Sequence, residues 1–197
     1  AQEADGALAA GQTQLAASIR EQIERMRRQV DYHLAHARAA ASGATPGASA
    51  NVAESAESLA RTVRRLHAGS NLAIDVDVPA DLAVRCQRED LDEMLGNLLD
   101  NACKWARTRV IVKSAPVLPP EGGSSVAIVI DDDGPGIEKE MREAVLQRGV
   151  RADEASPGSG LGLAIVRELV ELYGGSVRLT ASPLGGLRAT VQLPSAS

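Results

Sequence analysis

Two different stripes of side chains share the segment Glu89–Trp105, and they constrain the fold more than any other part of the chain. Apolar residues recur at three- and four-residue spacing, which predicts an amphipathic helix with one face in the core. The apolar stripe consists of Leu91, Met94, Leu95, Leu98, Leu99, Ala102 and Trp105. The polar stripe consists of Asn97, Asn101 and Lys104, which fall on one side of the predicted helix.

The polar stripe has two interpretations. Asparagine is a poor helix former, so two of them one turn apart are unusual on a merely solvated surface. Amide oxygens suit a hard cation such as Mg²⁺, and a lysine three residues later suits a phosphate. In the alternative interpretation the helix is simply amphipathic and both asparagines are incidental.

The composition favours a soluble globular protein with one ordinary domain and an extension. The chain has 197 residues, of which 44% are hydrophobic and 24% charged. The net charge of -5 argues against nonspecific nucleic-acid binding, and no apolar run is long enough for a membrane span. We therefore expect no nucleic acid and no membrane contact. The isolated Cys86 and Cys103 predict small buried hydrophobes in a reducing compartment.

The N-terminal part predicts a separate unit, residues 1–45, before a domain at residues 48–197. Residues 15–41 carry a near-heptad apolar stripe, which predicts a long coiled-coil-like helix that packs on another chain or on a segment absent here. Its members are Ile19, Ile23, Met26, Val30, Leu34 and Ala37. Residues 42–50 are rich in small residues and predict a flexible joint.

Beyond the joint, helices and strands alternate irregularly and the chain ends in a hairpin. This order predicts an α+β fold, with a mixed sheet and helices on one face. The unbroken apolar run Val126–Ile130 predicts a central strand that is covered on both faces. The predicted helices are 52–67, 89–105, 138–146 and 161–173, and the predicted strands are 72–78, 82–86, 110–112, 126–130, 177–180 and 187–193.

The strand ending at Ile130 runs into Asp131-Asp-Asp-Gly-Pro-Gly-Ile137. A carboxylate at the end of a central strand can accept a hydrogen bond from an exocyclic amine such as that of adenine. Glycines let the backbone bend and approach a flat base. Three aspartates without a basic neighbour repel one another, which favours a functional reason over the alternative, an ordinary Asp-Gly turn.

A second glycine-rich loop, Gly158-Ser-Gly-Leu-Gly-Leu163, leads into a predicted helix. Free N–H groups and the positive dipole at a helix N-terminus suit a phosphate. The spacing matches neither the dinucleotide fingerprint nor the P-loop. Upstream, Arg148 and Arg151 lie in a polar stretch and can reach a terminal phosphate; the alternative is a solvated loop.

The order of these motifs resembles the ATP-binding domain of sensor histidine kinases, whose Bergerat fold is shared with DNA gyrase, Hsp90 and MutL. The resemblance covers residues 52–193. Asn97–Ala102 is similar to the N box, Asp132–Gly136 to the G1 box and Gly158–Gly162 to the G2 box. It implies a two-layer α/β sandwich that binds ATP and Mg²⁺.

The resemblance also implies roles for residues. Magnesium is expected on Asn97 and Asn101, and phosphate on Lys104. Adenine is expected on Asp132, with Trp105 nearby. The other implied nucleotide contacts are Gly134, Gly136, Ile137, Gly158, Gly160, Leu161, Gly162 and Leu163.

Residues 138–160 correspond to a lid over the nucleotide. It carries Arg148 and Arg151, which together with Asn97 and Lys104 form the implied catalytic set. The lid has Leu146-Gln-Arg-Gly149 in place of the usual Phe-x-Pro-Phe, which resembles PhoQ-like sensors.

One position favours a kinase over an ATPase. Members that hydrolyse ATP directly carry a general-base Glu where this chain has Asn97, and an amide cannot take a proton from water. Phosphoryl transfer still needs only a metal, positioning and charge neutralisation. The phosphoacceptor motif of the family is absent, because His33, His36 and His67 lack an adjacent carboxylate. We therefore expect a truncated kinase that cannot phosphorylate itself.

The expected function is the catalytic portion of a sensor histidine kinase, which transfers the γ-phosphoryl of ATP to a histidine for relay to an aspartate. The implied partners are a second copy, through a helix bundle, and the receiver domain of a response regulator. The implied location is the cytoplasmic side of an inner-membrane sensor. The alternatives are a non-catalytic ATP-binding or dimerisation module and a Bergerat-fold ATPase.

Overall fold

The computed structural model describes residue 26 and residues 48–66, 71–118, 123–147, 149–150 and 160–196. The chain divides into two units, Ala1–Arg38 and Ala39–Ser197, and the fold below is that of the second unit. The predicted long helix, residues 15–41, lies outside the described residues except for Met26, which is helical and exposed.

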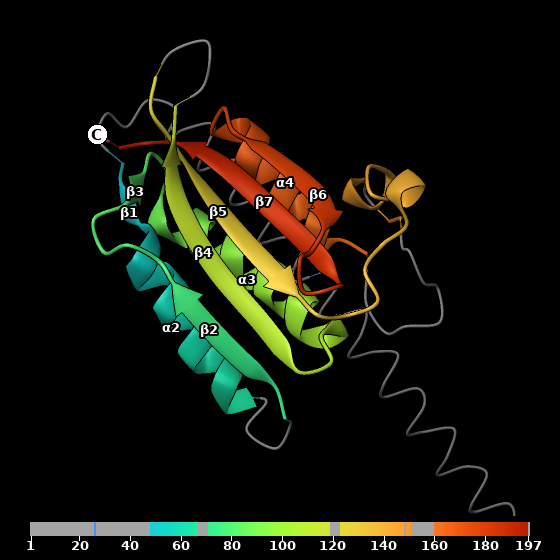
Figure 1. The fold of residues 1–197 in the computed structure, drawn as a ribbon. Coiled ribbons are helices and arrows are strands. Elements are labelled where there is room, and N and C mark those ends of the chain that lie inside the picture. Colours follow the sequence, from blue (N-terminus) through green and yellow to red (C-terminus); the bar gives the residue numbers. More distant parts are fainter. Residues whose placement is uncertain are drawn as a thin grey trace, which may run out of the picture. The chain divides into compact units, whose positions relative to one another are not determined.

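In its described part, the second unit is a mixed five-stranded sheet with helices on one face (Figure 1). The strands follow the order β2 (Ala73–Asp77), β4 (Arg109–Val117), β5 (Ser125–Asp132), β7 (Leu187–Pro194) and β6 (Ser176–Ala181). β2 runs parallel to β4, and the other neighbours are antiparallel. Two short strands, β1 (Ala50–Asn51) and β3 (Ala83–Val84), pair separately. The predicted α+β sandwich is confirmed.

Three helices cover the inner face of the described sheet: α2 (Val52–Leu66), α3 (Arg88–Trp105) and α4 (Gly162–Leu172). α3 contacts both of the other two helices, as its long apolar stripe requires. Asn51 caps α2, because its Oδ1 accepts the N–H of Glu54 at 2.9 Å while its Nδ2 donates to the carbonyl of Ala80 at 2.7 Å.

The predicted apolar stripe of α3 forms the centre of the core. All of its members except the partly exposed Trp105 are buried. They pack with aliphatic side chains from the sheet and from α4, since the chain has no Phe. The buried sheet and α4 residues include Val110, Val112, Ile128, Ile130, Val191, Leu193, Val166 and Leu169.

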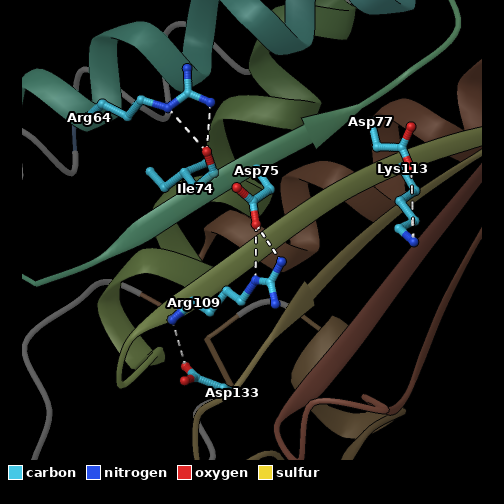
Figure 2. Close-up of polar contacts among 7 residues, drawn as sticks. All are labelled: Arg64, Ile74, Asp75, Asp77, Arg109, Lys113 and Asp133. Carbon is cyan, nitrogen blue, oxygen red and sulfur yellow. Dashed lines mark hydrogen bonds and ion pairs between the residues drawn. The ribbon is translucent and has the colours of Figure 1, made fainter.

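The position of β5 is confirmed as central, but the expected cover on both faces is wrong. Val126, Ile128 and Ile130 point into the core, whereas Ala127 and Val129 are partly exposed. Among the described elements, helices line one face only, so the apolar run of β5 reflects its place in the middle of the sheet. The other face, here called the open face, carries ion pairs between β2 and β4 (Figure 2).

Several predicted element boundaries differ from the structure. Ala50, at the end of the expected flexible joint, is buried and belongs to β1, and residues 42–47 lie outside the described part. The predicted helix at 138–146 is two short 3₁₀ turns, η1 (Lys139–Met141) and η2 (Ala144–Leu146). β4 continues past its predicted end because it pairs with β5 as far as Val117 opposite Ser125.

Candidate functional site

Asp132 is the last residue of β5. One of its carboxylate oxygens accepts backbone hydrogen bonds, and the other has no hydrogen bond from the described residues. Only 3% of the residue is exposed. Its Oδ1 accepts the N–H of Gly134 at 2.8 Å and the N–H of Leu187 at 3.2 Å. No hydrogen bond from the described residues reaches Oδ2. Burial raises the pKa of Asp132 above its ordinary value, although the two backbone hydrogen bonds oppose this.

The two neighbouring aspartates, Asp131 and Asp133, have different partners. One of these partners is an arginine, so the expectation that the cluster has no basic neighbour is wrong. Asp131 forms a bidentate ion pair with Arg188 of β7, with N–O distances of 2.9 and 2.8 Å. Asp133 faces the turn between α3 and β4, where backbone N–H groups of residues 107, 108 and 109 and the Thr108 hydroxyl donate to it. Burial acts to raise the pKa of Asp133, but these hydrogen bonds outweigh it and hold that pKa well below its ordinary value.

Glycines let three backbone segments meet around Asp132. A Cβ added at Gly134 would lie 2.5 Å from the carbonyl oxygen of Trp105. A Cβ added at Gly186 would lie 2.1 Å from Asp132 Oδ1 and 2.5 Å from the N atom of Gly134. Real Cβ atoms do not approach other atoms this closely, so these positions admit only glycine without a shift. The turn before β7 therefore packs directly on the Asp132 loop.

Sequence reasoning missed the contribution of β7 to the site. Gly186, Leu187 and Arg188 all touch the aspartate cluster, although they stand more than fifty residues later in the chain. From the sequence, the Gly185-Gly186 pair predicts only the turn that joins the strands 177–180 and 187–193. An antiparallel pairing of the last strand with the central strand would have brought these residues to the end of β5, and the sequence alone did not establish that pairing.

The polar stripe of α3 lies between the Asp132 loop and α4. Asn97 and Asn101 are partly exposed, and Lys104 is exposed. Nδ2 of Asn97 donates to the Glu93 carbonyl at 2.9 Å, and a Cβ added at Gly162 would lie 3.1 Å from Asn97 Oδ1. The amide oxygen of Asn97 therefore faces the first turn of α4. The Lys104 ammonium lies 5.1 Å from the centre of the Trp105 ring.

The start of α4 contains the described part of the glycine-rich loop at residues 158–163, and its phosphate role stays a prediction. Gly160 has a φ of +66°, Leu161 precedes the helix, and Gly162 and Leu163 open it. The N-cap residue, Leu161, has no side chain that caps this N-terminus, and helix geometry leaves the first N–H groups without a partner inside the helix. Gly158, Arg148 and Arg151 lie outside the described residues.

The first part of the expected lid is attached to α4. Val145 and Leu146 are buried, and Arg167 of α4 donates to Glu143 at 3.1 Å. Arg142 donates to the carbonyl of Ile137 at 2.9 Å, which fixes the exit of the Asp132 loop. These contacts explain why this segment forms compact 3₁₀ turns rather than a separate helix.

A magnesium ion fits the donor set at the polar stripe. Within the described ranges there is no group of three His, Cys, Asp or Glu side chains that could hold a metal ion. A cation beside α3 would therefore depend on amide oxygens and on the phosphates of a nucleotide. The amide nitrogen of Asn97 is bonded to the Glu93 carbonyl, so the side-chain oxygen is the atom left to act as a ligand.

Both cysteines are free and buried, as expected. Burial, with help from nearby aspartates, raises the pKa of Cys86 to about 12 and that of Cys103 to about 11. Neither is a thiolate at neutral pH, which argues against a redox role. Among the described helices, none has the length and apolarity needed to cross a membrane.

Comparison with known proteins decides the family. The model of the "Histidine kinase-, DNA gyrase B-, and HSP90-like ATPase" family matches residues 86–197. The chain belongs to this family. The matched part contains α3, the Asp132 loop, α4 and the β6–β7 hairpin, which are the elements that build the site described above.

Within the family, the chain is similar to sensor histidine kinases. It is 45% identical to the sensor protein kinase CarS of Pseudomonas aeruginosa, over 94% of this chain and 40% of CarS. It is 33% identical to PhoQ of Salmonella typhimurium, over 87% of this chain and 34% of PhoQ. The chain thus spans less than half the length of these relatives.

A solved structure supports the same group. That of the mycobacterial sensor histidine kinase MprB is 33% identical and superposes with a TM-score of 0.65, over 75% of this chain and 96% of that chain. The described domain is a histidine kinase ATPase domain, and the expected resemblance to PhoQ-like sensors is confirmed. The family supports ATP as the nucleotide, whereas magnesium stays a prediction.

Proposed function

We propose that this chain is the catalytic portion of a sensor histidine kinase that binds Mg-ATP and transfers its γ-phosphoryl to a histidine. The observation that carries the proposal is Asp132, whose Oδ1 is fixed by two backbone N–H groups while no described residue bonds to Oδ2. An acceptor held in this way matches the 6-amino group of adenine and rejects a base that presents an acceptor there.

The remaining residues of the proposed site would contact either the adenine base or the phosphates of ATP. Trp105 would lie beside the base, since its carbonyl already contacts the Asp132 loop. Asn97 and Asn101 would hold Mg²⁺, and Lys104 would bind phosphate. When bound, Mg²⁺ neutralises phosphate charge. The other proposed contacts are Gly134, Gly136, Ile137, Gly158, Gly160, Leu161, Gly162 and Leu163 to the nucleotide, and Arg148 and Arg151 to the transferred phosphoryl.

Asn97 favours a kinase over an ATPase. Its side chain carries no base, and its amide nitrogen donates to the Glu93 carbonyl, which leaves the carbonyl oxygen toward α4. An amide in this place orients a ligand and does not activate water. The proposed product is a phosphohistidine, from which an aspartate of a response regulator receiver domain takes the phosphoryl.

The proposed context concerns the segments and partners around the catalytic domain. Residues 1–45 would belong to a dimerisation bundle that pairs two copies, and residues 48–197 would form the catalytic domain. The domain would act on the cytoplasmic side of a membrane sensor, without itself contacting membrane or nucleic acid. The names of CarS, a sensor protein kinase, and PhoQ, a virulence sensor histidine kinase, support the sensor part of this proposal.

Incubation with γ-labelled ATP tests the proposal. The chain is mixed with a helix bundle that carries a phosphoacceptor histidine from a related sensor kinase, with and without Mg²⁺. The kinase predicts Mg²⁺-dependent label on the bundle and little free phosphate. Rapid release of phosphate with no labelled bundle would favour the ATPase, and ATP binding without either product would favour a non-catalytic module.

A further inference from the structure

Asp131 and Arg188 form the last rung of the pairing between β5 and β7. They stand directly opposite each other in the antiparallel register. The Asp131 side chain is 4% exposed and that of Arg188 is 37% exposed, so a buried carboxylate depends on a half-buried guanidinium. Removal of one partner from such a pair is costly because it leaves an uncompensated buried charge.

The next residue on each strand belongs to the nucleotide site. Side chains alternate between the faces of a sheet, so Asp131 and Arg188 lie on the open face while Asp132 faces the other way. The N–H of Leu187 donates to Asp132 Oδ1 at 3.2 Å, a longer contact than the 2.8 Å from Gly134. The ion pair and the Asp132–Leu187 hydrogen bond therefore fix the same two peptide segments from opposite faces.

Other described cations near Asp131 are already engaged. Arg109 donates twice to Asp75, at 2.9 and 2.7 Å, and Lys113 lies 3.9 Å from Asp77 (Figure 2). The residue of β4 opposite Asp131 is Ile111, which has no charge. Arg188 is thus the cation that neutralises Asp131 among the described residues, and its loss has no ready substitute.

We propose that Arg188 is a positioning residue for nucleotide recognition: through Asp131 it holds the start of β7 against the end of β5, and so aims the Asp132 carboxylate at the purine amine. The proposal rests on the proposed function, in which Asp132 binds adenine. Without the guanidinium, the charged Asp131 must turn toward water, and the strand ends separate. The Leu187 N–H then leaves Asp132, whose free oxygen loses its fixed direction.

The test compares two nucleotides that differ only in the amine. The affinities of ATP and of purine riboside triphosphate, which lacks the 6-amino group, are measured by calorimetry on wild type, Arg188→Met and Arg188→Lys. Wild type should prefer ATP by about tenfold or more, as a hydrogen bond to a carboxylate implies. Arg188→Met should lose most of this preference, and Arg188→Lys should restore part of it.

Arg178→Met is the matched control. Arg178 is exposed on the neighbouring strand β6 and pairs in register with Thr190, so it lies on the same open face. Its replacement should leave the preference for ATP unchanged. A drop in the preference for ATP equal to that of Arg188→Met would overturn the proposal, because any arginine on this face would then suffice.

The failures are distinguishable. If folded Arg188→Met binds both nucleotides more weakly by the same factor, or keeps the wild-type preference, Arg188 does not position Asp132. If wild type itself shows no preference for ATP, the adenine contact is wrong and the proposed function fails first. Should Arg188→Met not fold, Asp131→Ala removes the carboxylate through which Arg188 acts and leaves no unpaired buried charge. That variant should also lose most of the preference for ATP, and an unchanged preference in it would overturn the proposal.

Discussion

The Asp132 end and the Asn97 end of the proposed site are built in different ways. Around Asp132, the contacts come from backbone N–H groups, from two glycines with no room for a side chain, and from a paired neighbour, Asp131. Around Asn97, the contacts come from side chains along one helix, and these side chains range from partly exposed to exposed.

In the proposed function, this difference separates recognition of the base, at the Asp132 end, from binding of the metal and phosphates, at the Asn97 end. The end near Asp132 is fixed before a ligand arrives, because backbone and strand register determine where its oxygen lies. In the proposed function, the end near Asn97 would bind a metal ion and phosphates that arrive with the nucleotide. Base selectivity should therefore depend on small backbone shifts, and metal dependence on single side chains.

The largest effect is expected from Asp132→Asn. The amide oxygen can still accept from Gly134 and Leu187, but the amide nitrogen would then meet the adenine amine, donor against donor. The lost charged hydrogen bond and the unpaired amine together predict about a hundredfold weaker ATP binding. A fluorescent ATP analogue measures it, with Asp133→Asn as the neighbouring control. Unchanged affinity would mean that the base binds elsewhere.

Gly186→Ala tests whether backbone packing fixes the Asp132 end of the proposed site. The added methyl group would overlap Asp132 Oδ1, at 2.1 Å, so the loop must move and ATP affinity should fall by about tenfold to a hundredfold. Gly96→Ala is the control, since its nearest neighbour would be 3.9 Å away and alanine favours a helix. Titration calorimetry measures the ATP affinity of both variants. Equal affinities would contradict the claim that backbone packing fixes the part of the site around Asp132.

Asn101→Ala tests the other end. Loss of one amide ligand should weaken Mg-ATP by roughly tenfold, and binding in the presence of chelator should stay as in wild type. Asp100→Ala is the matched control, because that exposed neighbour lies off the polar stripe. If Asn101→Ala responds to Mg²⁺ as wild type does, the ion is not held there.

The smallest expected effect is on the free energy of unfolding and its dependence on pH. Replacement of Asp132 and replacement of Asp133 should change this free energy in opposite directions. The folded-state pKa of Asp132 is raised, so its ionised form opposes folding, and Asp132→Asn should be more stable than wild type at neutral pH. The pKa of Asp133 is lowered, so Asp133→Asn should be less stable there. The Asp132 difference should shrink as the pH falls toward about 4, because the raised pKa lies above that value. The Asp133 difference should shrink only as the pH falls below about 4, because its pKa is lowered. Chemical denaturation at several pH values measures both. The same sign for both would contradict this assignment.

The sequence predicted the fold well where patterns are local. The stripe of α3 and the hairpin of β6 and β7 follow from the spacing of Leu, Val and Ile, and their burial agrees. The order of the strands in the sheet is not local. For that reason Gly186, Leu187 and Arg188 were missed, and the aspartates were wrongly expected to lack a basic partner.

Element boundaries were predicted less well for a physical reason. Ala50 has no side chain that would mark a strand, and its burial comes from pairing with Val84 far along the chain. The segment after Ile137 has helical composition, yet contacts with α4 hold it in 3₁₀ turns. Tertiary contacts decide such short elements more than local preference does.

The most direct measurement is a crystal structure of the chain with Mg²⁺ and a non-hydrolysable ATP analogue. The exocyclic nitrogen of adenine should lie within hydrogen-bond distance, about 3 Å, of Asp132 Oδ2. The metal should contact the amide oxygens of Asn97 and Asn101. A purine bound away from Asp132, or an amine that faces no carboxylate, would contradict the proposed mode of recognition.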